Sequence, residues 1–468
     1  MNDPYKHIRY KEQYKSNDFF WGIGIENETY LQFTNSNKML TKDIHQNHKP
    51  ERYSVNYFAG LNPEYKSLLK LLFPVDVDTY DIPYYMNAHT LQKTDVSGNH
   101  ITTYEKVPKP NKNFKGKILH DLLIETSQIF DKKYNVNYMY DGDTIEFMTQ
   151  NFYKTTIKDN IDELIREKYL YLEAINYAFQ KHVLYPELGP LMYPVKNEPF
   201  VCFLTNKTNI GIFNNGTYHL NFTMPTQLDT TIKPLYPSEF VNQHKAAIRY
   251  IQYLEPLIIA LYGTPDPFSK VSPFYSKASQ RCAVSRYIGI GTYNTEEMKT
   301  GKILTIETTD CLASKKDYWW YTQYTKDSHY NPLTKIGVDI NFNKHDNHGI
   351  EIRFLDWFPE HLLEDLMICI VNTLDYSLKY GLPSDPTICP IWNGLVVKML
   401  KEGSDAMITD EEYTLYSRIF RLKKPFLNTT KSKSETIKTL YKTITKSLKK
   451  ISGPCRKYMM NELGCGCL

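Results

Sequence analysis

Four segments, far apart along the chain, each alternate apolar residues with residues that can do chemistry. In residues 22–30, Ile23 and Ile25 alternate with Gly24, Glu26 and then Glu28. Because successive side chains of a β-strand point to opposite faces, the two carboxylates face one side and the two isoleucines face the other. An isolated pair of this kind is usually a solvated sheet face. The recurrence of the pattern in three further segments favours a shared functional surface instead.

The other three segments have the same division into an apolar and a polar side. Their polar residues are Glu146 in 140–149, His219 and Asn221 in 216–225, and Glu351 and Arg353 in 349–359. Carboxylate oxygens with a single imidazole suit Mg²⁺ or Mn²⁺ better than Zn²⁺. An arginine beside such an ion suits a phosphoryl group in transfer. If the four strands lie side by side in one sheet, these residues form a metal–phosphate site; otherwise they are solvated sheet faces.

The elements expected to position these residues are strands and helices in mixed order. Strands are predicted at 21–33, 139–149, 336–342 and 349–357, and a strand pair is predicted at 200–224, turning at Asn214-Asn-Gly216. Helices are predicted near 117–130, 158–180, 237–262, 360–380 and 391–402. The rest of the stretch from 34 to 135 is predicted to be irregular. This mixture indicates an α+β fold built on an antiparallel sheet.

Seven motifs, in order along the chain, resemble those of the glutamate–cysteine ligase family, which belongs to the glutamine synthetase superfamily. The four polar-faced segments resemble that family's metal-binding and phosphate-binding strands. Residues 253–265 are similar to that family's helix ending in a Phe-Gly-Ala-Ser-Pro turn. Residues 285–294 are similar to its Leu-Arg-x-Ser-x-Leu-Gly-Tyr segment, and residues 391–403 are similar to its Trp-Asn helix. Together the matches run from about residue 20 to about residue 405.

The resemblance implies a fold and an order of domains. It implies an α+β, glutamine-synthetase-like catalytic domain over residues 21–405, with a curved antiparallel sheet flanked by helices. Within this domain, residues 34–135 are expected to be a long insertion. An N-terminal arm is expected at 1–20, and a C-terminal helical extension, the basic tail, at 406–468.

The resemblance also implies an activity, an ATP- and Mg²⁺- (or Mn²⁺-) dependent ligase that joins a carboxylate to an amine through an acyl phosphate. In that family the γ-carboxylate of glutamate is joined to cysteine, within glutathione biosynthesis. The resemblance implies that the metal ligands are Glu26, Glu28, Glu146, His219 and Glu351. It implies catalytic roles for Arg353 and Glu28, and substrate binding by Arg286 and Asn221. Whether Asp141 or Asp143 adds a further carboxylate stays open.

Two departures from the family pattern weaken the assignment of the amine acceptor. No arginine is found before the His219 strand, where Lys207 is the nearest base. Residues 336–342 replace the family's Asn-Glu-Leu-Tyr-x-x-x-Arg segment. Another amino acid, a peptide or a protein amine therefore remains an alternative acceptor. An alternative of a different class is a non-catalytic, membrane-associated protein that retains the fold.

Positive charge is concentrated near the C-terminus, although the net charge of the chain is only +4. Ten lysines and two arginines stand against one glutamate between Arg421 and Lys457. Apolar residues recur there at helical spacing, namely Ile437, Leu440, Ile444, Leu448 and Ile451. This pattern predicts a basic amphipathic helix, which either docks on the body or binds an anionic membrane surface. The final residues, 465–468, have the form of a prenylation box, so Cys465 is a candidate for lipidation.

The remaining composition restricts the class of protein. The chain has no apolar leader and no run of about 18 apolar residues, which predicts a cytoplasmic protein, either free or peripheral to a membrane. Eight cysteines without a CxxC pair fit a reducing compartment. The basic tail has no interleaved aromatic pattern, so no specific nucleic-acid partner is predicted. ATP and amino-acid substrates are the expected partners.

Overall fold

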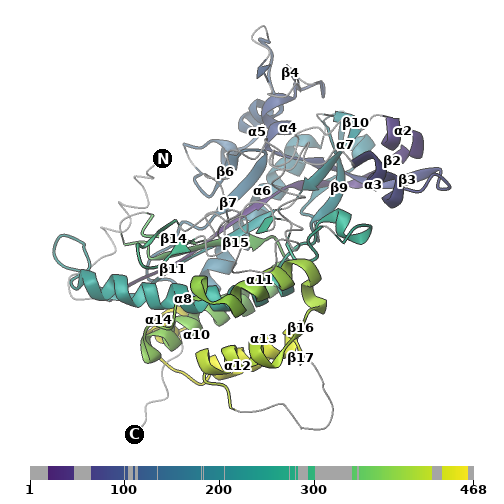
Figure 1. Cartoon of the computed structure of the whole chain (residues 1–468). Coiled ribbons are helices and arrows are strands. Elements are labelled where there is room, and N and C mark those ends of the chain that lie inside the picture. Colours follow the sequence, from purple (N-terminus) through teal and green to yellow (C-terminus); the bar gives the residue numbers. More distant parts are fainter. Residues whose placement is uncertain are drawn as a thin grey trace.

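A six-stranded antiparallel sheet carries the four polar-faced segments as neighbouring strands (Figure 1). The computed structural model describes residues 19–46, 65–99, 101–103, 109–110, 114–133, 135–180, 182, 184–204, 206–214, 216–273, 275–279, 281–282, 293–300, 340–344, 347–423 and 435–461. The strand order is β14-β15-β11-β1-β7-β6. The strands are β1 (Phe19–Thr29), β6 (Tyr138–Asp141), β7 (Thr144–Met148), β11 (Thr217–Gln227), β14 (Ile340–Phe342) and β15 (Ile350–Asp356). The prediction that the four segments share one sheet is confirmed.

One face of this sheet is the hydrophobic core. Ile25, Leu220 and Ile352 come from three neighbouring strands, and each is at most 1% exposed. The helices that contact these strands or pack on one another beside them are α6 (Ile157–Phe179), α8 (Pro237–Tyr262) and α10 (Leu363–Tyr380). Helix α8 continues through Pro256 and ends at Gly263, where a Cβ atom would lie 2.5 Å from the carbonyl oxygen of Ala278. The opposite, polar face is thereby left to the ionisable side chains.

A second sheet of five strands is built partly from the stretch expected to be irregular. Its order is β10-β9-β3-β2-β8, in which β3 and β9 are parallel and the other pairs antiparallel. The strands are β2 (Leu31–Leu40), β3 (Thr79–Met86), β8 (Leu191–Met192), β9 (Glu198–Phe203) and β10 (Asn206–Asn214). The expectation of irregular structure is wrong for β2 and β3. A register shift in β2 between Gln32 and Ser36, and Pro83 inside β3, interrupt the alternation from which a strand is recognised.

The predicted hairpin at Asn214-Asn-Gly216 is also wrong. Strand β10 ends at Asn214 in the five-stranded sheet, whereas β11 begins at Thr217 in the six-stranded sheet. Gly216 is instead a point of close packing, since a Cβ atom there would lie 2.5 Å from the carbonyl oxygen of Glu28. Its carbonyl accepts a hydrogen bond from the amide of Trp357 at 2.7 Å. Gly216 thus lies where the chain passes from one sheet to the other, packed against β1 and bonded to the residue that follows β15.

The remaining elements are short or lie beyond the two sheets. The helices are α2 (Thr41–Gln46), α3 (Tyr65–Leu72), α4 (Ala88–Lys93), α5 (Leu119–Thr126), α7 (Leu184–Leu188), α11 (Pro390–Glu402), α12 (Asp410–Ile419), α13 (Ile437–Leu448) and α14 (Pro454–Met459). The short strand pairs are β4 (Thr102–Thr103) with β5 (Lys109–Pro110), β12 (Tyr293–Asn294) with β13 (Lys299–Thr300), and β16 (Met407–Ile408) with β17 (Glu435–Thr436). The described part of the chain therefore has an α+β architecture, whose two larger sheets are one antiparallel and one mixed.

The basic helix of the tail, α13, is docked on the body. Its apolar residues Leu440, Ile444 and Leu448 are fully buried, and they belong to the same hydrophobic cluster as the core of the six-stranded sheet. The next helix, α14, is held at its start by Asp375 of α10, whose carboxylate accepts from the amides of Cys455 and Arg456. The amphipathic pattern is confirmed, and its apolar face is covered by protein. None of the helices in the described part of the chain is long and apolar enough to cross a membrane.

Candidate functional site

The strand register places the predicted polar residues opposite one another on one face of the sheet. Glu26 of β1 pairs with His219 of β11, and Glu28 of β1 pairs with Glu146 of β7. Asn221 of β11 pairs in turn with Glu351 of β15. Directly opposed residues have Cα atoms only about 4.5–5.5 Å apart, so their side chains meet. A row of ionisable groups therefore crosses four strands.

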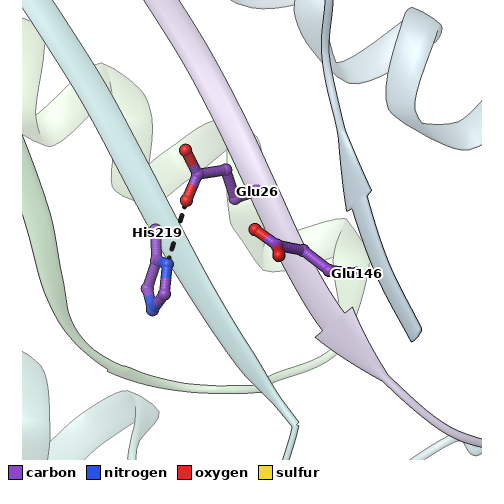
Figure 2. Close-up of side chains that lie close together, drawn as sticks. All are labelled: Glu26, Glu146 and His219. Carbon is purple, nitrogen blue, oxygen red and sulfur yellow. Dashed lines mark hydrogen bonds and ion pairs between the residues drawn. The ribbon is translucent and has the colours of Figure 1, made fainter. Parts of the chain in front are cut away.

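The centre of this row is a cluster of Glu26, Glu146 and His219, whose side chains converge in Figure 2. One oxygen or nitrogen from each of the three lies within 4.8 Å of the others. Nδ1 of His219 is 3.1 Å from a carboxylate oxygen of Glu26, and the Asn221 amide donates to the other oxygen at 3.4 Å. Two carboxylates and one imidazole at this spacing form a donor set that suits Mg²⁺ or Mn²⁺.

The electrostatics of the cluster also fit a cation. Burial, together with the neighbouring carboxylates Glu26, Glu28 and Asp141, raises the pKa of Glu146 to about 8. Negative charge is thus crowded around Glu146, which is only 8% exposed. A divalent cation among these oxygens would neutralise that charge and favour the ionised form of every carboxylate.

Glu28 lies beside the cluster in a different electrostatic setting. Nε2 of His219 is 3.9 Å from its carboxylate. Burial alone would raise the pKa of Glu28, but the positive fields of His219, Arg281 and Arg353 outweigh burial and lower it. Glu28 is therefore ionised where Glu146 resists ionisation, although the two residues are opposed across β1 and β7.

Glu351 is engaged by donors on the other side of His219. Its carboxylate accepts from Arg353 at 2.6 Å, from the Asn341 amide at 2.7 Å and from Lys344 at 3.2 Å. Burial acts to raise the pKa of Glu351, and the charge on Arg353 lowers it. The predicted ligands are thus divided, with Glu26, Glu146 and His219 forming one cluster and Glu351 held in a network of its own.

The pairing of β15 with β11 brings Arg353 to the cluster. Leu220 of β11 pairs with Ile352, so one residue further along each strand Arg353 lies opposite His219, on the same face as Glu351. The register shifts only beyond this point, where Tyr218 pairs with Leu355. The Arg353 guanidinium consequently lies 3.4 Å from Nδ1 of His219 while it is bonded to Glu351.

The site includes three further residues that were not predicted from the sequence. The guanidinium of Arg281 lies 3.4 Å from Nε2 of His219, while Asn341 and Lys344 bind Glu351 from β14 and the turn after it. Asn341 had a usable signal, because it alternates with Ile340 and Phe342 in a predicted strand. Arg281 had none, since it lies outside any periodic segment.

Glycines on β1 leave room for an aromatic wall beside the cluster. Gly22 and Gly24 share the face of Glu26, and a Cβ atom on Gly24 would lie 2.7 Å from the Phe152 ring. That ring stacks on His348 with a centroid distance of 4.5 Å. His348 is 9% exposed and also contacts the ring of Tyr153. Phe152 and His348 line a small cavity of about 30 Å³ that reaches Glu26, Asn221 and Lys344.

The remaining predicted residues lie beside or beyond this cluster. Asp143 is buried, and burial followed by the charge of Glu28 keeps its pKa well above the usual range, whereas Asp141 is exposed. Neither belongs to the three-residue cluster. Arg286 and Cys465 lie outside the described residues, and their assignments stay predictions.

Comparison with known proteins gives one informative relative. The chain matches no known family model. It is 42% identical over 405 residues to the uncharacterized protein R704 of Acanthamoeba polyphaga mimivirus, a match that covers 86% of this chain and 71% of the relative. Identity at this level over most of both chains implies a common fold. The chain therefore belongs to the same family as this mimivirus protein.

Proposed function

We propose that the protein is an ATP- and Mg²⁺-dependent carboxylate–amine ligase with a glutamine-synthetase-like fold. The observation that carries the proposal is the row of Glu26, Glu146 and His219 with Arg353 at its edge, 3.4 Å from His219. Carboxylates and one imidazole suit the ions that accompany ATP, and an arginine beside them suits the phosphoryl group that moves. The resemblance to glutamate–cysteine ligases supports the same class of reaction.

In this proposal the metal ligands are Glu26, Glu28, Glu146, His219 and Glu351. A Mg²⁺ or Mn²⁺ ion bound there would neutralise charge on the triphosphate and polarise its γ-phosphoryl group. Asn221 would orient Glu26 through its amide, and the aromatic wall of Phe152 and His348 borders the site on that side.

The proposed reaction has two steps. An oxygen of the substrate carboxylate attacks the γ-phosphorus, and the bond between that phosphorus and the β–γ bridging oxygen breaks, which releases ADP. Arg353 stabilises the charge that develops on the transferring group. The amine then attacks the acyl carbon, inorganic phosphate leaves, and the amine loses a proton. We propose the γ-carboxylate of glutamate as the first substrate and cysteine as the first amine to test.

Release of ADP tests the proposal directly. Purified protein is incubated with ATP, Mg²⁺ and glutamate, alone and with each of a panel of amines that includes cysteine, other amino acids and short peptides. We expect amine-dependent ADP release and a product whose mass equals the two substrates minus water. Replacement of Mg²⁺ by EDTA should abolish release, and Mn²⁺ should restore it.

Matched variants separate this site from a contaminating ATPase. Glu351→Gln keeps the shape of the side chain but removes one ligand charge, whereas Asp76→Asn changes an exposed carboxylate that is not part of the row. Loss of activity in Glu351→Gln with full activity in Asp76→Asn would support the proposal. Equal activity in both variants, or no amine-dependent release from the wild type, would favour the non-catalytic alternative.

A further inference from the structure

A second pocket lies between the tail helix α13 and the ends of α8 and α10, and it contains none of the residues of the polar row. It encloses about 700 Å³ and is lined by Leu261, Tyr262, Leu362, Asp365, Cys369, Ser404, Thr436, Lys438, Tyr441, Lys442, Thr445 and Lys449. That volume is within the range of about 300–1,000 Å³ typical of small-molecule sites. The pocket is thus large enough to hold a ligand of its own.

The rim of this pocket is a stripe of lysines on α13. Lys438, Lys442, Thr445 and Lys449 follow one another at intervals of four, three and four residues, so at about 3.6 residues per turn they lie along one side of the helix. All three lysines are exposed, and none forms an ion pair with a described carboxylate. Asp365 is the single acidic residue in the lining. Three positive charges against one negative leave the rim with a net charge of +2.

The floor of the pocket is apolar. Leu261 and Leu362 supply aliphatic surface, and the rings of Tyr262 and Tyr441 meet edge to face with centroids 6.2 Å apart. The Tyr441 hydroxyl is buried, and the neighbouring Cys369 thiol and Tyr262 hydroxyl contribute, after burial, to a pKa raised well above the usual range. Among the described residues of the lining, the polar side chains other than the lysines and tyrosines are Asp365, Ser404, Thr436 and Thr445.

We propose that this pocket binds a single-chain lipid that carries a phosphate headgroup. The acyl chain would lie on the apolar floor, where its burial supplies the favourable free energy. The headgroup would lie at Lys438, Lys442 and Lys449, because a phosphate monoester carries a charge of about −1.5 to −2 at neutral pH and matches the net charge of the rim. The lysines face the pocket while the apolar side of α13 is buried in the body, so the helix presents charge rather than a membrane-inserting face.

This proposal is independent of the proposed ligase activity. Its residues belong to α8, α10, α13, the residues directly flanking α10 and α13, and the segment after α11, whereas the polar row belongs to β1, β7, β11 and β15. Binding can therefore be measured without ATP or metal, and either proposal can fail while the other stands.

Titration calorimetry with the full chain tests the pocket. The probe is oleoyl lysophosphatidate at concentrations below micelle formation, compared with oleoyl lysophosphatidylcholine and with glycerol 3-phosphate. We expect micromolar binding of the lysophosphatidate, binding of the choline lipid weaker by about ten-fold or more, and none of glycerol phosphate, which lacks the chain. Binding of glycerol phosphate as tight as that of the lipid, or no binding of the lysophosphatidate, would overturn the proposal.

Two double variants in α13 and the turn that follows it provide the matched comparison. Lys442→Ala/Lys449→Ala removes two rim charges, and Lys446→Ala/Lys450→Ala removes two exposed lysines of the tail that do not line the pocket. We expect the first to weaken lysophosphatidate binding by about ten-fold or more and the second by less than about two-fold. Equal losses of affinity in the two variants would show that binding depends on the overall charge of the tail, which would contradict the proposal. Binding confined to phosphatidylserine vesicles, without binding of lipid monomers, would identify a membrane surface as the ligand and reject the pocket.

Discussion

Positive charge is held in opposite ways in the polar row of the six-stranded sheet and in the pocket under α13. In the polar row, Arg353 and Lys344 are both bonded to Glu351, and Arg281 lies against His219. In the pocket, three lysines line a rim without an ion pair to any described carboxylate. Charges that face one another across strands are balanced inside the protein, whereas those on the helix are balanced by solvent until an anion binds.

Burial explains this difference. His219 and Glu351 are each 2% exposed, and a charge so far from water is tolerated only with a partner. The three lysines keep their ammonium groups in water and need no partner. The polar row is consequently a preorganised site in which small displacements matter, and the pocket is an open one in which net charge and apolar area matter more.

The largest expected effect is the loss of phosphoryl transfer in Arg353→Ala. Because the guanidinium is held by Glu351 next to His219, its removal eliminates the group that would stabilise the transferring phosphoryl, with an expected fall in kcat of about 10³-fold. Steady-state ADP release measures this effect. Arg353→Lys should recover only a small part, since one ammonium does not reproduce the guanidinium fork. Unchanged kcat in Arg353→Ala would place the phosphoryl group elsewhere.

The next largest effect is on folding, in the buried face of α13. Ile444→Ala removes a fully buried side chain from the shared core and should lower the free energy of unfolding by about 2–5 kcal/mol. Lys446→Ala, two positions along the same helix, should change it by less than about 0.5 kcal/mol. Urea denaturation of both variants measures the contrast. Similar values would mean that α13 is not an integral part of the fold.

The metal-free protein should become less stable as the pH rises from about 4.5 to about 8 because of Glu146. Its pKa is 4.5 when unfolded and about 8 when folded, so within this window the folded protein holds a proton that the unfolded chain has released. The free energy of unfolding should then fall by at most about 1.4 kcal/mol per pH unit from this one group. The loss of stability from this group has not begun below pH 4.5 and is complete above about pH 8.

Comparison with Glu146→Gln isolates this group from others that titrate. Denaturation curves in EDTA at several pH values should show a shallower decline for the variant. Saturating Mg²⁺ should stabilise the wild type more at pH 8 than at pH 5, because the ion favours the ionised carboxylate. Parallel curves for the two proteins in EDTA would show that Glu146 titrates normally.

The smallest effect concerns Lys344, whose side chain is 43% exposed. Its ion pair with Glu351 competes with a cation for the same carboxylate, and such a partly exposed pair is worth at most about 1 kcal/mol. Lys344→Ala should therefore tighten Mn²⁺ binding in the absence of ATP by up to about five-fold. Calorimetry with Mn²⁺ measures the change. Weaker Mn²⁺ binding in the variant would show that Lys344 supports the metal site instead of competing with it.

Prediction from the sequence succeeded where side-chain periodicity was regular. The alternation at Glu26, His219 and Glu351 identified strands with one apolar and one polar face, and the spacing of Ile437, Leu440 and Ile444 identified α13. Prediction from the sequence failed where the role of a residue depends on a segment that is distant along the chain. The Asn-Gly pair at 215–216 resembled a turn, but Gly216 serves the packing of β1 and Trp357.

The sequence by itself determined which residues share a face, because the two-residue repeat of a strand and the 3.6-residue repeat of a helix are local properties of the backbone. Only the tertiary structure decided which faces meet. The strand order placed His219 between Glu26 and Arg353, and the register of β15 on β11 set Arg353 opposite His219. The packing of distant segments brought Arg281 and Lys344 to the row. Contacts of this kind depend on how distant segments pack, and no spacing along the chain encodes them.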